Sequence, residues 1–486
     1  MKRYIILLSG ISALLFASCK KELKETPYSI LTPNNFYQNA TDAQAAINGV
    51  FSQLQPQAYY QRTIYIITEC SADCLQPLLT QNQERIDMYK LQYTATNIEI
   101  TNWWQNSYKL ISRANDVIAN VPGVNMDATA RNNILGNAYF LRGMAYFDLV
   151  RSFGDVPLIL KPILSASDSS LFPTRTPSAA IYQQVISDLK FAEANCFSED
   201  KIASANKGMV SSGAASAMLA RVYLQRASTP FADAQDNQNA LAECNKVINS
   251  NTYKLMTDYT DVFNWDKKFY PTQTENIFSV QFGTNGSSIT QNITCRMFSP
   301  SQLGGSGSFL ANVNFFNKGY GPNDVIRKGW NLSNKVGTTS VNPFIYKYRD
   351  AQWVAGTNNS RMNWIVIRYA DVLLMQSEAM NNINAADPGK FDGINKVRAR
   401  AGLTGTDVLS LANTPTQSAF VDTLVAERAR ELCVEGHRRW DLIRLGRYKQ
   451  VEASIGFTLQ DYQMLLPIPQ TELDANKNLK QNTGYQ

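Results

Sequence analysis

The chain has 486 residues, of which 44% are hydrophobic and 18% are charged. This composition is that of a globular protein, and it excludes both an intrinsically disordered chain and one embedded in a membrane. The net charge is only +6 and no dense block of Lys or Arg occurs, which argues against a nucleic-acid partner.

The N-terminus has the pattern of an export signal. Lys2 and Arg3 give it a positive start, positions 4–16 are mainly apolar, and small residues lead up to Cys19. A cysteine at this point resembles the end of a lipoprotein signal, in which Cys19 becomes the acylated first residue. The sequence therefore predicts a signal peptide over 1–18 and a lipid on Cys19. No later stretch has the ~20 apolar residues that a membrane span needs.

Helical periodicity dominates the part of the chain that follows. Apolar residues between Ala43 and Leu54 recur at steps of four, three and four, behind a capping-box pattern that starts at Thr41. Comparable spacings continue beyond this first helix. They predict helices over 42–55, 100–120 and 131–153.

Pairs of similar helices then recur along the chain. Small residues such as Gly143 and Ala217 stand where paired helices would cross, which permits close approach of their backbones. Such pairs are typical of degenerate tetratricopeptide-like hairpins. The predicted pairs are 178–195 with 207–226 and 367–381 with 391–400, and 237–249 is predicted to be half of another pair.

The segment between Tyr253 and Trp364 differs from these helices. It is rich in Asn, Gly, Ser and Thr, and it contains four of the seven tryptophans of the chain. A loop-rich insertion carried by a helical scaffold is a common arrangement for a binding site. The sequence therefore predicts a mainly α fold, a tetratricopeptide-like scaffold with an irregular central insert.

The stretch 419–447 carries the most specific residue string of the chain, ERARELCVEGHRRWDLIRLGR. It begins as an amphipathic helix in which Glu427 and Arg430, and Arg428 and Glu431, are spaced as neighbours on the helix surface. Gly436 supplies a candidate helix stop. By periodicity alone this would be a salt-bridged surface helix.

Three blocks of the chain resemble the SusD/RagB family of outer-membrane nutrient-binding lipoproteins. They are NAYFLRGMAYFDLVRSFGDVPLI at 137–159, WIVIRYADVLLMQSEAMN at 364–381, and the string at 419–447. The resemblance implies one SusD-like domain over 19–486, with scaffold at about 41–250 and 365–450 and the insert at about 253–364. It further implies a surface lipoprotein that binds a glycan and acts as the lid of a SusC-like TonB-dependent transporter in the outer membrane.

Signatures of an enzyme are largely missing from the sequence. His437 is the only histidine, so metal sites with two histidines are excluded, and its place in a basic run favours a structural role. Neither a phosphate loop nor a dinucleotide-binding glycine pattern occurs. We therefore expect no catalysis, cofactor or metal. Cys70 and Cys74 are close enough to form a local disulfide, or are incidental.

Binding sites for sugars combine flat aromatic rings with planar amide, carboxylate and guanidinium groups. If Trp104 faces the helix core, Trp103 points elsewhere and is the better platform for a sugar ring. By their position in the resemblance, the other candidates for ligand contact are Arg85, Tyr89, Tyr320 and Trp330.

Three other functions stay open at this stage. A peptide-binding homologue of the RagB branch would use the same scaffold, although the abundance of Asn and aromatic residues favours a sugar. A lipid-anchored glycosidase would need two carboxyl groups facing each other at ~5–9.5 Å. A tetratricopeptide adaptor would present a polar concave surface without a ligand pocket.

Overall fold

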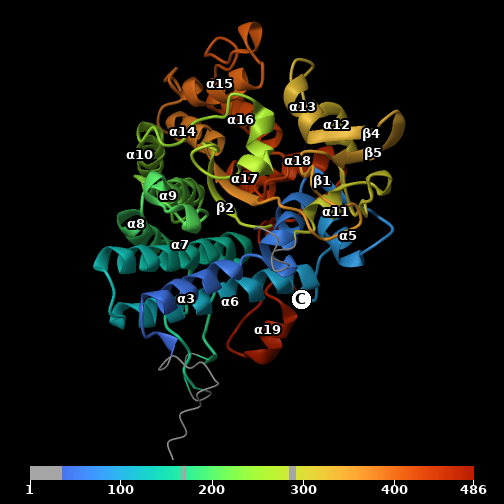
Figure 1. Cartoon of the computed structure of the whole chain (residues 1–486). Helices are drawn as coiled ribbons and strands as arrows, with labels where there is room; N and C mark the ends of the chain where they lie inside the picture. Colours follow the sequence, from blue (N-terminus) through green and yellow to red (C-terminus); the bar gives the residue numbers. More distant parts are fainter. Residues whose placement is uncertain (1–35, 166–167, 169–170, 284–291, 486) are drawn as a thin grey trace, which may run out of the picture.

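The computed structural model describes residues 36–165, 168, 171–283 and 292–485. The predicted signal peptide and the predicted lipidation site at Cys19 lie outside these residues. Within them the chain is mainly helical, as expected, and the helices form a curved stack that runs from the lower part of the molecule up its left side (Figure 1).

Each helix of the stack packs against the next helix of the stack. Ala145, Ala217 and Ala220 are fully buried in it, and a Cβ added at Gly143 would meet Leu189 at 3.3 Å. The expected close crossings of small residues are therefore present. In order, the stack contains α3 (Ala40–Ser52), α6 (Ile98–Asn120), α7 (Ala128–Phe153), α8 (Ser178–Asn195), α9 (Ser212–Ala227) and α10 (Asp236–Asn249).

The first helix begins slightly earlier than predicted. Its N-cap is Asn39, whose side chain accepts hydrogen bonds from the backbone N–H of Thr41 at 2.9 Å and of Asp42 at 3.2 Å. The Asp42 carboxylate in turn accepts from the backbone N–H of Asn39. This is a capping box, placed two residues before the predicted one at Thr41.

The helix predicted to be half of a pair finds its partner on the far side of the insert. α10 packs against α14 (Tyr369–Ile383), although about 120 residues separate them in the chain. α14 also packs against α15 (Lys390–Arg400), as the sequence predicted for the last pair. It packs against α16 (Gln417–Glu431) as well, which was not predicted. The insert thus lies in the chain between two helices that still pack against each other as a hairpin.

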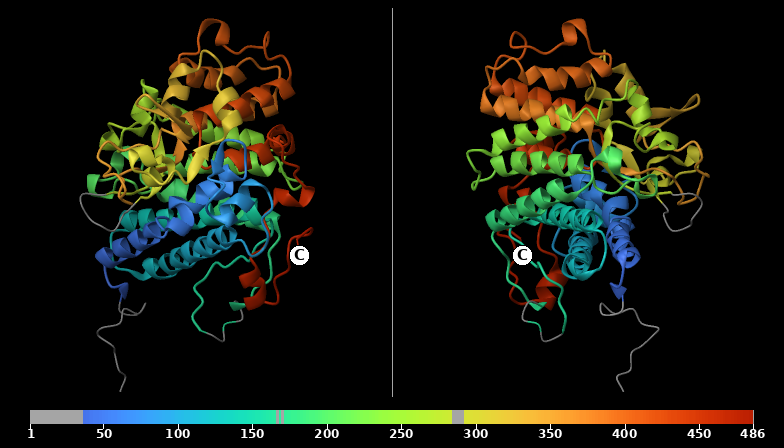
Figure 2. Two further views of the ribbon diagram at one scale, coloured as in Figure 1. Left: turned by 90° about the vertical axis from the view of Figure 1, so that its right-hand side faces the viewer. Right: turned by 60° about the vertical axis from the view of Figure 1, so that its left-hand side comes forward.

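The insert lies beside the stack, on the right in Figure 1, and the turned views in Figure 2 show the two parts packed together. Three short antiparallel pairs of strands lie within the insert or join its ends to neighbouring segments. They join β1 (Leu75–Pro77) to β3 (Phe309–Ala311), β2 (Asn276–Val280) to β6 (Trp364–Arg368), and β4 (Leu332–Val336) to β5 (Thr339–Ile345). Its short helices are α11 (Thr294–Phe298), α12 (Val313–Lys318) and α13 (Val325–Asn331).

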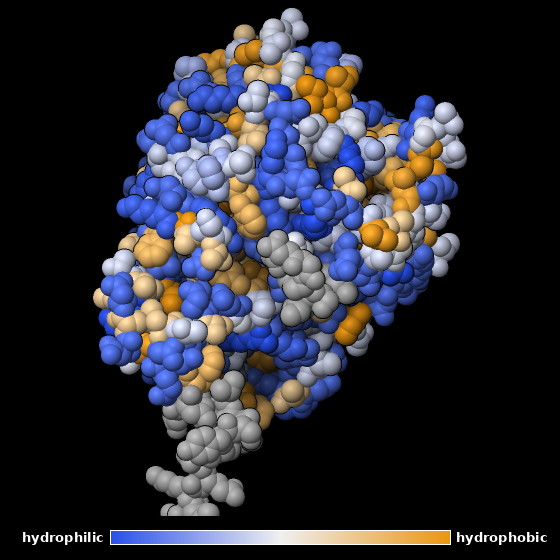
Figure 3. Space-filling view, viewed as in Figure 1, coloured by the Kyte–Doolittle hydropathy of each residue, from blue (hydrophilic) through white to orange (hydrophobic). Residues whose placement is uncertain are grey.

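One large hydrophobic core runs through both the stack and the insert. Tyr348 of the insert stacks on Trp364 with ring centroids 5.6 Å apart, and Trp364 also contacts Tyr65 of the N-terminal part. The outer face seen in Figure 3 is mainly hydrophilic, with separate hydrophobic patches. Among the helices of the described residues, none combines the length and the apolar character that a membrane crossing requires.

The segment around Gly436 differs from its prediction. α16 ends at Glu431, five residues before Gly436, and both Val434 (φ +57°) and Gly436 (φ +85°) have left-handed backbone conformations. The chain turns there so that the backbone N–H groups of 436–438 donate to the Glu69 carboxylate, and α17 (Arg438–Arg444) follows.

Candidate functional site

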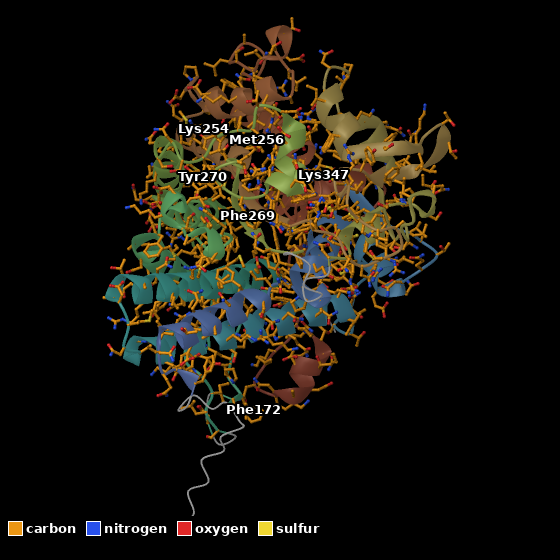
Figure 4. The ribbon with its side chains drawn as sticks, in the orientation of Figure 1. Phe172, Lys254, Met256, Phe269, Tyr270 and Lys347 are labelled. Atoms are coloured by element: carbon orange, nitrogen blue, oxygen red, sulfur yellow. The ribbon has the colours of Figure 1, made fainter. Side chains whose placement is uncertain are left out.

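The charged residues of the 419–447 stretch lie inside the protein rather than on its surface. Arg368 of β6 bonds to Glu275, Glu431 and Glu435, and all four side chains are at most 1% exposed. Glu435 also accepts a hydrogen bond from Lys347, which lies deep in the molecule (Figure 4). We call the bonded group of Arg327, Lys347, Arg368, Arg400, Glu275, Glu427, Glu431 and Glu435 the buried network.

The interpretation of this stretch as a surface helix is therefore wrong. Glu427 does face Arg430, at 3.7 Å, but Arg428 pairs with Asp371 and Asp441 instead of Glu431. Arginines on several elements hold the pKa of Glu431 down at about 2, against the effect of its burial. These residues tie α16 to β6 and the insert, so they form scaffold.

A different charged cluster lies where the N-terminal part meets the insert. Glu99 stands in the first turn of α6, where the helix dipole favours a carboxylate. Its Oε1 lies 3.5 Å from Arg62 and 3.5 Å from Arg85, and its Oε2 accepts a hydrogen bond from Thr63 at 2.8 Å. We call Arg62, Arg85 and Glu99 the arginine cluster.

Local structure explains why these side chains meet. Asn82 caps α5 (Gln83–Tyr89), the helix that carries Arg85, and Asn97 caps α6. The Asn97 side chain also donates to the backbone oxygen of Glu84 at 2.9 Å, which fixes α5 against the start of α6. The guanidinium of Arg85 rests over the Phe309 ring of β3, 5.2 Å from its centroid.

The arginine cluster makes fewer hydrogen bonds than Arg368 of the buried network, although Nε of Arg400 in that network also has no partner among the described residues. Within the described parts of the chain, Nε of Arg62 and Nε of Arg85 have no hydrogen-bond partner, and neither does the Tyr65 hydroxyl. Burial raises the pKa of Tyr65, while Arg62 and Arg85 act in the opposite direction, so the hydroxyl stays protonated. The side chains of Arg62 and Arg85 are 19% and 13% exposed, whereas Glu99 is 2% exposed. Solvent therefore reaches parts of the two arginine side chains, though not their Nε atoms, and hardly reaches the carboxylate.

Of two further predicted contacts, Tyr89 connects the same region to the insert, whereas Tyr320 lies within the insert and faces α16. The Tyr89 hydroxyl accepts a hydrogen bond from Asn312 at 3.1 Å, and Asn312 caps α12. Tyr89 is half-buried. Tyr320 is buried, and its hydroxyl bonds to Asn331 and to the backbone of Arg430. Tyr320 therefore supports the insert from inside.

Trp330 is half-buried on the insert and forms part of a stack. The guanidinium of Arg349 lies between the rings of Trp330 and Tyr346, 3.4 and 3.7 Å from their centroids. Burial lowers the pKa of Arg349. Among the described residues, the indole N–H of Trp330 has no hydrogen-bond acceptor. Besides Tyr89 on α5, this flat stack is another surface on which a sugar ring could pack.

Trp103 is not a surface platform. It is fully buried, its Nε1 donates to the Ser152 hydroxyl at 3.2 Å, and its ring lies 4.9 Å from Tyr59 and 6.1 Å from Trp440. The expectation that it points away from the core is wrong because α6 is covered on more than one side, so that neighbouring Trp103 and Trp104 are both buried.

Trp104 lines a separate apolar groove of about 330 Å³ between α6 and the C-terminal segment, with Phe172 on its rim. Figure 4 shows Phe172 at the lower end of the molecule, far from Lys347. None of the predicted ligand contacts lines this groove.

The structural role expected for His437 fits its environment. Burial lowers its pKa to about 3, and nearby Arg221 acts in the same direction. The thiols of Cys70 and Cys74 are buried and free. The described residues contain no cluster of His, Cys, Asp and Glu that could hold a metal ion.

The sequence interpretation missed Arg62 and Glu99. Glu99 had a usable signal, since an acidic residue two positions after a capping Asn97 predicts a helix start. Arg62 had none, because it lies where an irregular helical turn ends (φ −141°, ψ −53°). Its approach to Glu99, 37 positions later, depends on tertiary packing.

Comparison with protein families gives two matches. The model described as "SusD family" matches residues 205–485, and the model described as "Starch-binding associating with outer membrane" matches residues 23–224. The first covers more than half of the chain, and together they span nearly all of it.

Individual proteins agree with these matches. SusD-like protein P25 of Formosa agariphila is 28% identical, over 96% of this chain and 97% of its own. The crystal structure of a SusD homologue from Bacteroides thetaiotaomicron superposes with a TM-score of 0.81 at 22% identity, covering 93% of this chain and 98% of that one. A structure described as a laminarin-binding SusD-like protein has a TM-score of 0.76 at 24% identity, covering 92% and 100%.

Proposed function

Since the chain belongs to the SusD family, we propose that it captures an oligosaccharide at the cell surface and delivers it to a SusC-like TonB-dependent transporter, over which it acts as a lid. The family consists of non-catalytic binding proteins, and this chain is one of them. The observation that carries the proposal is the junction between α5 and the insert. There, Arg85 and Tyr89 expose polar groups beside β3 and Asn312.

A glycan is favoured over a peptide as the ligand. The relatives include a laminarin-binding protein, and one matching family is described as starch-binding. The junction itself places the half-buried Tyr89 ring beside the partly exposed amide of Gln76, which suits a sugar, while the buried Asn312 holds the Tyr89 hydroxyl. Peptide binding remains the alternative on the same scaffold.

Calorimetry on the chain from Lys21 onward tests the choice of ligand. Oligosaccharides and peptides are titrated side by side, and release of reducing ends is assayed in the same samples. We expect one class of glycan to bind without cleavage. Binding of peptides alone would assign the protein to the alternative, and release of product would contradict a pure capture function.

The anchor and the partner need separate experiments. We propose that Cys19 carries the lipid, so Cys19→Ala should move the protein out of the membrane fraction. The lid function requires a complex with the transporter, which co-purification from outer membranes through a tag on this chain would detect. Recovery of the lipidated protein without any TonB-dependent transporter would contradict the lid.

A further inference from the structure

The arginine cluster carries an excess of positive charge. Two guanidinium groups face a single carboxylate, which is already stabilised by Thr63 and by the start of α6. The acidic residues of α5, Glu84 and Asp87, are one and two positions from Arg85, so they belong to other faces of the helix.

Arg85 is the more open of the two arginines. In the part of the chain that the structure describes, neither of its terminal amino groups donates a hydrogen bond, while the Phe309 ring supports the guanidinium plane. Among the described residues, the one hydrogen bond that the Arg62 side chain donates goes to Gln57 at 3.5 Å, the limit for such a bond. By contrast, the buried Arg142 forms a two-pronged pair with Asp188, with both distances 2.8 Å.

An open guanidinium fork matches a carboxylate or a sulfate, because two parallel N–H groups can bind two oxygens of the anion. A neutral sugar needs no such charge, since amides and hydroxyls satisfy its hydroxyl groups. Tyr89 follows Arg85 by one helical turn on the same face of α5, so a sugar ring on Tyr89 could present an acidic substituent to Arg85.

We infer that the captured glycan is acidic, bearing uronic-acid carboxylates or sulfate esters, and that Arg85 and Arg62 bind this acidic group. The inference rests on the glycan capture proposed above and names the substrate class for the same site. Glu99 orients both arginines without being reached by the ligand.

Matched pairs of ligands test the inference on the chain from Lys21 onward. Oligogalacturonate is compared with its carboxyl-reduced form of equal length, and a sulfated carrageenan oligosaccharide with its desulfated form. We expect one acidic member to bind at least tenfold more tightly than its neutral partner, with an affinity that falls as NaCl is added. Which pair shows the difference identifies the acidic group.

Three variants test which side chains bind the acidic group of the glycan. Arg85→Met replaces the guanidinium by an apolar side chain that can still pack on Phe309, and should weaken binding of the acidic member about tenfold or more. Arg85→Lys keeps the charge but loses the fork, and should give an intermediate loss. Glu99→Gln removes the competing negative charge while keeping an oxygen that can accept from Thr63, so it should tighten acidic binding several-fold.

Arg113→Met is the matched control. It removes the same charge from the same helix that holds Glu99, about 21 Å further along at 1.5 Å per residue, and should leave both affinities unchanged. Thermal unfolding of each variant confirms that it is folded. Equal affinity for acidic and neutral members would overturn the inference while leaving glycan capture intact. Binding of acidic peptides but of no saccharide would overturn both.

Discussion

The buried network and the arginine cluster are built from the same residue types, yet they differ in how completely their hydrogen bonds are used. Arg368 donates five hydrogen bonds to carboxylates and backbone, and is 1% exposed. The Arg85 guanidinium donates none within the described residues, and 13% of the Arg85 side chain is exposed. The first region holds the stack and the insert together, and the second is the proposed binding site.

This difference separates scaffold from site more clearly than residue type does. A buried charge is tolerated only when its partners surround it, so each open hydrogen-bonding group in such a place needs an explanation. In the buried network the surrounding groups are other residues of the chain. In the arginine cluster fewer partners come from the described part of the chain, which agrees with the acidic ligand proposed above.

The largest effect is expected from removing Arg368. Arg368→Met would leave Glu275, Glu431 and Glu435 facing one another in the interior with one cation fewer. Breaking a buried ion pair by removing one partner costs about 3–5 kcal/mol. Urea unfolding should show this loss, or the variant should fail to accumulate as folded protein. A loss below about 1 kcal/mol would mean that the network does not hold the insert.

Glu452 differs from the residues of both regions, because it is fully buried and its carboxyl group lacks a partner among the described residues. Among the described residues, neither of its carboxylate oxygens has a hydrogen-bond partner. Burial raises its pKa from 4.5 to about 8, and Asp73 adds to this effect. The folded protein therefore holds a proton on Glu452 that the unfolded chain releases above pH 4.5. The free energy of unfolding falls as pH rises from 4.5 to 8 and then levels off.

Glu452→Gln should remove this pH dependence. Between pH 4.5 and 8 the wild type should lose up to about 1.4 kcal/mol per pH unit relative to the variant. Urea unfolding at pH 5, 7 and 9 measures the difference, and Asp461→Asn, at a 93% exposed side chain, is the control. Parallel pH profiles for wild type and variant would show that Glu452 is ionised in the folded state.

A substitution at Trp103 tests whether a side chain packed in the core also affects glycan binding. Trp103→Phe keeps an aromatic ring but loses the hydrogen bond to Ser152 and leaves a small cavity, which should cost about 2 kcal/mol. We expect glycan affinity to remain unchanged, because the ring is fully enclosed by its neighbours. The comparison requires calorimetry at a temperature where the variant is folded. Weaker binding without a loss of stability would restore Trp103 as a platform.

Much of the fold could be predicted because its signals are local. The predicted helix at 178–195 coincides with α8, since apolar spacing and the proline before it act within the segment. The pairing of α10 with α14 could not be predicted, because nothing in the intervening sequence indicates that these two helices pack against each other. Burial of the 419–447 stretch was missed for a similar reason. Its partners Arg368 and Glu275 lie on distant strands and strand ends.

The site was predicted only in part. Arg85 and Tyr89, chosen by their position in the resemblance, lie at the junction with the insert, and their contact with a ligand stays a prediction. Trp103 and Tyr320 are enclosed by neighbours that sequence spacing does not reveal. Arg62 approaches Glu99 only through the packing of an irregular turn.

The smallest effect on stability is expected from Arg85→Met, the same substitution as at Arg368. Arg85 makes one ion pair of 3.5 Å with Glu99, which keeps Thr63 and Arg62 as partners after the change. The large cost of breaking a buried pair comes from the charge that is left unpaired, and Glu99 would not be unpaired here. The methionine side chain can also pack on Phe309 in place of the guanidinium. Urea unfolding should therefore place this variant within about 1 kcal/mol of the wild type. A loss comparable to that of Arg368→Met would mean that the arginine cluster is scaffold as well, and that its open hydrogen-bonding groups are not reserved for a ligand.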